Sequence, residues 1–308
     1  MTTHRTLRGK HMKSALTLLT AALTLAPLAA AQNVLNVATG AAGGTYATMF
    51  KNMGEVCTNA SFLRELHSSG SIENLDDLLS NKASLAFVQL DVLKARAQID
   101  HDPRTAQIRV LASLHHEELH LIALHQARTG GVLGIGSKLT GPLTFADLKG
   151  QTIGSWGGSV ITARVLAAQS GVPYNVTSFN DRDAALSALR NHQVSAVLAV
   201  VGQPASWMNA LDPATYALLP IPAATPHPNF YTPANLVYSN FGSSVPTLSV
   251  QSVLATRDFK TPEKKAQLLK YRDCLARHLT GLQEQEGMHP KWQDVTSLTG
   301  DSGWPTYR

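Results

Sequence analysis

The sequence has 308 residues, of which 44% are hydrophobic and 15% are charged, and its formal net charge is +5 at pH 7. This is the composition of an ordinary globular protein. Much of the positive charge lies in the first residues, whose removal leaves about +1, and no run of Lys and Arg with interleaved aromatic residues follows. Nucleic acid is therefore excluded as a partner.

Residues 1–31 predict a cleavable export signal. Four basic residues with no acidic neighbour precede the apolar run 15–30, which ends in the small residues 29–31 before Gln32. The run is about sixteen residues long and has no charged stop-transfer segment, whereas a membrane span needs roughly twenty. We expect a mature chain that is periplasmic or otherwise extracytoplasmic and that does not span the membrane after cleavage. A start at Met12 would leave the mature chain unchanged.

Strand-like runs alternate with amphipathic helical patterns from residue 33 onward. The first block predicts strands at 34–38, 62–67 and 85–89, and helices at 45–57 and from Ser71. The second block predicts strands at 152–156, 175–179 and 195–201, and helices from Ser159 and Asp181. A strand at 249–256 and a helix from residue 261 to about 282 follow. This alternation predicts two α/β lobes, each with a mostly parallel sheet flanked by helices and joined near residue 125.

The cysteines, Cys57 and Cys274, are 217 positions apart, in a compartment that permits disulfides. A metal or redox pair would normally have close spacing. Two interpretations remain open, namely two buried thiols or a bridge between an early and a late helix.

Residues 116–120 match the zinc motif HExxH, with histidines His116 and His120 and the acid Glu117 between them. On a helix the histidines would share one metal. The surrounding segment 109–124 has strand-like alternation, however, and residues four apart on a strand are separated by about 13 Å. We favour a polar strand that crosses between the lobes, away from the ligand, and keep a secreted zinc hydrolase as the alternative.

Glycine-rich turns precede two of the predicted helices, at residues 40–44 and 155–159. The first lacks the order G-x-G-x-x-G, residues 131–138 place Ser137 where a P-loop has lysine, and no G-x-S-x-G elbow occurs. The glycine-rich segment 130–136 therefore gives no nucleotide fingerprint. The turns instead offer free backbone N–H groups at helix N-termini, which suit a carboxylate or another anion.

Several of these segments resemble the TAXI family of TRAP-transporter solute receptors. Residues 36–46 are similar to its opening strand and Gly-Gly-Thr-Tyr turn, residues 69–75 to its G-S-x-E-N-L helix start, and residues 85–89 to its strand ending in glutamine. Weaker similarities cover residues 143–154 and 202–204. The family's G-S-G-T at the second helix start is replaced here by residues 156–162, and residues 220–246 are only weakly similar.

The resemblance implies a type II periplasmic binding protein fold, with residues 32–125 as the first part of lobe I, 126–227 as lobe II and 228–308 returning to lobe I. It also implies a receptor without enzymatic activity, cofactor or metal, which delivers a small organic anion, such as a carboxylate or an amino acid, to TRAP-type membrane permease subunits. A ligand-sensing partner of a membrane receptor is a further alternative.

Ligand-binding residues carried over from the resemblance would supply hydrogen-bond donors and shape. They are Gly43, Gly44, Thr45, Tyr46, Ser69, Ser71, Asn74, Gln89, Ser155, Gly158 and Ser159, with Tyr231 as a wall of the site. In this fold the C-terminal helix returns to the first lobe, where a bridge between Cys57 and Cys274 would need it.

Overall fold

The structure of the protein is a computed structural model that describes residues 1–3, 34–129, 138–140 and 143–308. Residues 4–31 of the expected signal peptide and the glycine-rich segment 130–136 lie outside these ranges. Residues 34–308 form a compact unit of their own. None of the helices in the described ranges has the length and apolar composition that a membrane span requires.

The strands alternate with helices, as the sequence pattern predicts. The strands are β1 Leu35–Ala38, β2 Leu63–Leu66, β3 Leu85–Gln89, β4 Ile108–Leu124, β5 Ala127–Thr129, β6 Lys138–Thr140, β7 Thr152–Trp156, β8 Asn175–Phe179, β9 Ala196–Val201, β10 Tyr216–Leu218, β11 Tyr231–Leu236 and β12 Val245–Arg257. The helices are α1 Thr45–Val56, α2 Ser71–Leu79, α3 Leu90–Gln98, α4 Ser159–Gln169, α5 Arg182–Arg190, α6 Pro262–Arg277 and α7 Leu279–Glu284.

Two parallel groups of strands lie at opposite ends of one continuous sheet with the order β2-β1-β3-β12-β4-β9-β7-β8. We call β1 to β3 with their helices α1 to α3 the first lobe, and β7 to β9 with α4 and α5 the second lobe. In the first lobe β1 runs parallel to β2 and β3, and in the second β7 runs parallel to β8 and β9. The predicted fold class, two α/β lobes of mostly parallel strands, is confirmed.

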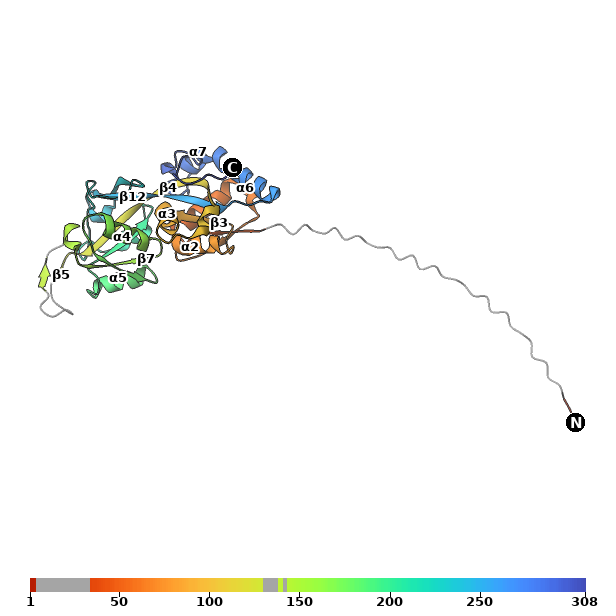
Figure 1. Cartoon of the computed structure of the whole chain (residues 1–308), viewed down its shortest axis with the longest axis horizontal. Coiled ribbons are helices and arrows are strands. Elements are labelled where there is room, and N and C mark those ends of the chain that lie inside the picture. The colour runs from red at the N-terminus through yellow and green to blue at the C-terminus, as the bar shows by residue number, and fades with distance from the viewer. Residues whose placement is uncertain (4–33, 130–137, 141–142) are drawn as a thin grey trace. The chain divides into compact units, whose positions relative to one another are not determined.

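The long strands β4 and β12 join the lobes (Figure 1). They pair with each other antiparallel over most of their length. At one end β12 pairs with β3 of the first lobe, and at the other end β4 pairs with β9 of the second. Every residue of β4 from Val110 to His115 is buried, which is expected for a strand with neighbours on both edges and helices over its faces.

The sequence predicts that the chain returns to the first lobe from residue 228, and the structure places this return later in the chain. Strand β11 pairs with the beginning of β12, and Tyr231, Leu248 and Val250 pack in the core of the second lobe. The return therefore occurs within β12. Beyond it, α6 contributes Leu268, Tyr271 and Leu275 to the core of the first lobe.

The helices follow the sequence pattern with two differences. In α1 the buried residues Tyr46, Met49 and Met53 recur at helical spacing and face the sheet. The late helix expected at 261–282 is interrupted at His278, which separates α6 from α7. Helix α3 is an addition to the prediction, because it begins directly after β3 without a turn signal.

Candidate functional site

A cavity of about 460 Å³ lies between the lobes, at the carboxyl ends of the parallel strands. Residues 39–46 after β1, Gln89 at the end of β3 and residues 156–159 after β7 all line it. Ligand sites of α/β sheets form at such strand ends, and the volume falls in the range of small-molecule pockets.

Three helices begin at this cavity with an uncapped N-terminus. The N-cap residues of α1, α2 and α4 are Gly44, Gly70 and Gly158, and none of them supplies a side-chain cap. The first N–H groups of a helix have no acceptor within the helix. These three termini therefore present free donors and partial positive charge to one cavity.

Glycines allow the two lobes to touch beside the cavity. A Cβ atom on Gly157 would lie 2.5 Å from the carbonyl oxygen of Ser69 across the cleft. A Cβ on Gly158 would overlap Gln89 Oε1 and lie 2.9 Å from Ser71 Cβ. Gly157 also has a φ of +51°, a conformation that glycine adopts more readily than other residues. This approach of the lobes therefore requires both glycines.

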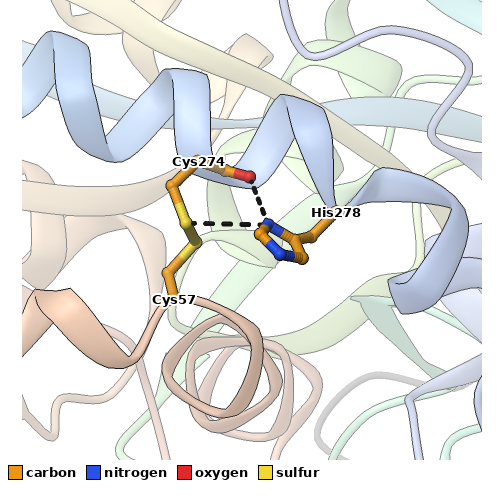
Figure 2. A group of neighbouring side chains, drawn as sticks. All are labelled: Cys57, Cys274 and His278. Atoms are coloured by element: carbon orange, nitrogen blue, oxygen red, sulfur yellow. Dashed lines mark hydrogen bonds between the residues drawn. A yellow bond between two sulfur atoms is a disulfide. The ribbon is translucent and has the colours of Figure 1, made fainter.

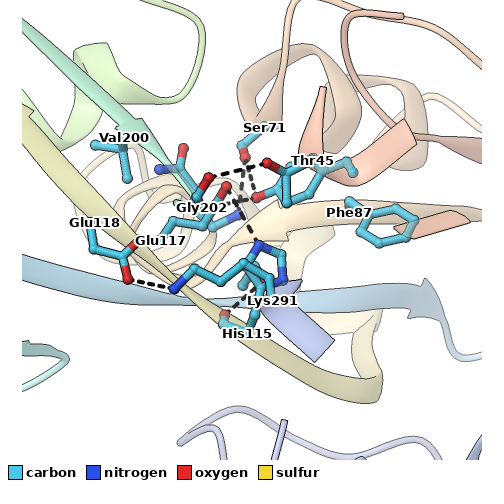
Figure 3. Close-up of polar contacts among 12 residues, drawn as sticks. Thr45, Ser71, Phe87, His115, Glu117, Glu118, Val200, Gly202 and Lys291 are labelled. Carbon is cyan, nitrogen blue, oxygen red and sulfur yellow. Dashed lines mark hydrogen bonds and ion pairs between the residues drawn. The ribbon is translucent and has the colours of Figure 1, made fainter. Parts of the chain in front are cut away.

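Among the buried polar side chains on the cavity wall are an amide and a carboxyl group. Gln89 is 3% exposed, and its Nε2 has no hydrogen-bond partner among the described residues. Glu117, in the middle of β4, is 4% exposed and accepts a hydrogen bond from the Tyr46 hydroxyl at 2.5 Å. Burial raises the pKa of Glu117 to about 8 and raises that of Tyr46 well above its usual value. Figure 3 shows Glu117 beside the start of α2 at Ser71.

The second lobe supplies a wall of aromatic and charged side chains. The rings of Trp156 and Trp207 meet edge to face, with 6.1 Å between their centroids. The Arg182 guanidinium lies 5.6 Å from the centre of the Trp207 ring and pairs with Asp183 at 2.8 Å. All four residues line the cavity.

A family model described as the NMT1-like family matches residues 37–271 of the sequence. The chain belongs to the NMT1-like family. Among curated proteins the sequence has no match.

Three solved structures illustrate the similarity of the fold. An arginine transport system periplasmic binding protein from Legionella pneumophila is 15% identical, with a TM-score of 0.44, over 80% of this chain and 94% of that one. A mutant of ArgBP from T. maritima is 12% identical, with a TM-score of 0.49, over 85% and 96%. The GluR0 ligand-binding core in complex with L-glutamate is 14% identical, with a TM-score of 0.48, over 80% and 94%.

Most of the expected binding residues line the cavity of this NMT1-like protein. They are Gly43, Gly44, Thr45, Tyr46, Ser69, Ser71, Gln89, Gly158 and Ser159.

The other three expected residues do not line it, because their polar atoms are used inside the protein. The side-chain amide of Asn74 donates to the carbonyl oxygens of Thr39 and Phe87. The Ser155 hydroxyl donates to a backbone carbonyl of β9 at 2.8 Å, and the Tyr231 hydroxyl donates to Asp91 at 2.7 Å. Asn74 and Ser155 make these contacts within one lobe, and Tyr231 makes its contact between the lobes.

The HExxH segment is the central part of strand β4, as the alternation predicts. His120 is buried, and its Nε2 atom forms a hydrogen bond with the Tyr238 hydroxyl at 2.8 Å. Burial lowers the pKa of His120 to about 4. The expectation that Glu117 lies away from the ligand site is wrong, because this residue lines the cavity. Residues alternate sides along a strand, so Glu117 faces opposite to His116 and Glu118.

Cys57 and Cys274 form a disulfide that joins the end of α1 to α6 (Figure 2). His278 Nδ1 lies 3.8 Å from Cys274 Sγ. Within the described residues, these three form the sole cluster of potential metal ligands. Because both sulfurs are bonded to each other, neither is available as a thiolate ligand.

Sequence reasoning did not select Trp156, Arg182 or Trp207 as ligand-facing residues. The sequence could have indicated Arg182, because this residue follows Asp181 at the start of a predicted helix in the second lobe. Trp207 lies in the short segment Ser206–Ala210, where no periodic pattern indicates which way a side chain points.

Proposed function

We propose that the protein is an extracytoplasmic solute-binding receptor that captures a small organic acid or amino acid in the cleft between its lobes. The observation that carries the proposal is the meeting of three uncapped helix N-termini, at Gly44, Gly70 and Gly158, around one cavity. Helix N-termini favour anions by charge and by hydrogen bonding.

The buried amide of Gln89 supports the same proposal. Its unpartnered Nε2 donor would be satisfied by a ligand acceptor such as a carboxylate oxygen. Each terminus contributes about 0.3 to 2 kcal/mol and each neutral hydrogen bond about 0.5 to 1.5 kcal/mol, so several must act together to reach the roughly 8 kcal/mol of micromolar binding.

Delivery to a TRAP-type permease is the finer part of the proposal. It rests on the resemblance of the Gly-Gly-Thr-Tyr turn and the G-S-x-E-N-L helix start to the TAXI family, and the expected export signal fits such a role.

The test is to identify by mass spectrometry the ligand that copurifies with the mature protein and to measure its affinity by calorimetry. An organic acid or amino acid at one equivalent is expected. Recovery of a neutral sugar or a nucleotide instead would contradict the proposal. Genetic linkage to a gene for a large membrane permease subunit would separate transport from ligand sensing.

A further inference from the structure

Glu117 forms no ion pair with a Lys or Arg among the described residues, although it lines the cavity. Oε2 accepts the Tyr46 hydrogen bond, whereas Oε1 lies 3.9 Å from His115 Nε2, beyond hydrogen-bond distance. Lys291, on the segment Pro290–Asp294, forms an ion pair with Glu118 at 2.5 Å instead (Figure 3). It forms a second ion pair with Asp294, also at 2.5 Å.

The surroundings of Glu117 do not compensate a negative charge. His115 is buried, and burial lowers its pKa well below the usual value, so that it is neutral. Burial has the largest effect on the pKa of Glu117 and raises it, whereas the hydrogen bond from Tyr46 lowers it. The carboxyl groups of Asp91 and Glu118 raise this pKa further, and Lys291 lowers it. A buried carboxylate at a cavity wall without a cation is costly unless it binds a proton or a cationic ligand group.

Glu117 is close to the helix N-terminus of α2, one of the three that we propose bind an anion. The Tyr46 hydroxyl that donates to Glu117 also lies 3.4 Å from Ser71 Oγ, and Ser71 is the first residue of α2. One tyrosine hydroxyl therefore links the carboxyl group to an uncapped helix N-terminus. Sites for a positive and a negative group thus lie next to each other.

We propose that Glu117 receives a positively charged group of the ligand, so that the cleft selects compounds with an ammonium and a carboxylate on the same or neighbouring carbon atoms. This inference rests on the proposed function, because the helix N-termini must bind the carboxylate. A ligand with two carboxylates and no ammonium would instead bring a negative charge toward Glu117.

Binding of such a ligand is coupled to loss of a proton. With a pKa of about 8, the Glu117 carboxyl is largely protonated at pH 6.5 in the empty cleft. An ammonium group favours the carboxylate form, and the released proton passes to solvent. His115 and Tyr46 stay neutral in this step, because burial lowers the pKa of His115 and raises that of Tyr46.

The experiment compares matched ligand pairs on the mature protein. Each L-amino acid is tested against the carboxylic acid that lacks only its amino group, such as L-glutamate against glutarate and L-phenylalanine against 3-phenylpropanoate. For a pair that binds, the amino compound is expected to bind about tenfold or more tightly. Glu117→Gln should remove most of this preference, and Glu117→Asp should retain part of it.

Calorimetry at pH 6.5 in buffers of different ionisation enthalpy measures the proton. About one proton should be released on binding to the parent and about none with Glu117→Gln. His116→Ala, on the opposite side of β4, is the matched control and should keep both the preference and the proton release.

Two outcomes separate the inference from the function it rests on. Equal affinities within each pair, or an unchanged preference in Glu117→Gln, would overturn the role of Glu117 while acid binding stands. Failure of every carboxylate to bind the parent would overturn acid recognition itself, and this inference with it. Urea unfolding of each variant establishes that it is folded.

Discussion

The Thr162 hydroxyl donates a hydrogen bond to the Asp91 carboxylate over 2.5 Å, and so connects α4 of the second lobe to α3 of the first. The Tyr231 hydroxyl donates to the same oxygen at 2.7 Å. Asp91 is 1% exposed, and burial raises its pKa although both hydroxyls oppose the rise. This buried group therefore depends on donors from the opposite lobe.

Removing either donor should destabilise the protein. Tyr231→Phe and Thr162→Val are each expected to lower the free energy of unfolding by about 1.5 to 3 kcal/mol, the range for hydrogen bonds to charged groups. Urea denaturation measures the change. Tyr174→Phe is the control, because the Tyr174 side chain is also buried, yet its hydroxyl forms no hydrogen bond with the described residues. Equal effects at positions 231 and 174 would argue against the Asp91 contact.

Breaking the Cys57–Cys274 disulfide should also lower stability. The bridge spans a sequence separation of 217, and closing so long a loop stabilises a protein by roughly 3 to 5 kcal/mol in the chain-entropy model. Denaturant unfolding with and without a reductant gives the difference. Thiol titration of the unfolded, unreduced mature protein should find no free thiol, and two thiols per chain would contradict the bridge.

Adding one carbon atom at Gly158 should interfere with closure of the cleft. In Gly158→Ala the new Cβ would overlap Gln89 Oε1, so ligand affinity should fall about tenfold or more, and further than in Ser71→Ala. Gly54→Ala is the matched control in α1, where an added Cβ meets nothing within 4 Å. It should keep its affinity and gain about 0.5 to 1 kcal/mol of stability. Calorimetry with the copurified ligand decides between these outcomes.

The raised pKa of Glu117 predicts how stability depends on pH. The folded protein holds a proton on Glu117 up to about pH 8, whereas the unfolded chain loses it near the ordinary value of 4.5. Folding therefore becomes less favourable as pH rises from about 4.5 to about 8. Glu117→Gln cannot lose a proton and should match the parent near pH 4 and exceed it in stability above pH 8. A constant difference between the two proteins across this range would contradict the raised pKa.

The alternation of strands and helices was predictable because each element of a parallel lobe has its own periodic pattern. Helix α3 was not, since Leu90 follows the buried strand β3 without a break and Gln89 serves as its N-cap. The apolar residues of β3 and those of the first turn of α3 form one continuous apolar segment in the sequence. Only the pairing of β3 with β1 and β12 shows where the strand ends.

The site was predictable where backbone turns form it, and not where side chains come together from distant segments. Glycines before α1 and α4 are visible in the sequence as helix starts. The contact of Glu117 with Tyr46 joins positions 71 residues apart, and the orientation of Glu117 follows from the pairing of β4 with β12. Asn74, Ser155 and Tyr231 have the polar groups that a ligand needs, but backbone and side-chain acceptors inside the protein use them.

The first lobe is completed by the last residues of the chain. Its core contains Leu275, Trp292 and Tyr307, and the Tyr307 backbone N–H donates to Val110 in β4 at 2.8 Å. During synthesis this core therefore remains incomplete until residue 307 has been made. The segments that build the first lobe early in the chain therefore wait for partners that are made more than 170 residues later, and this part of the lobe cannot fold as an independent unit in the order of synthesis.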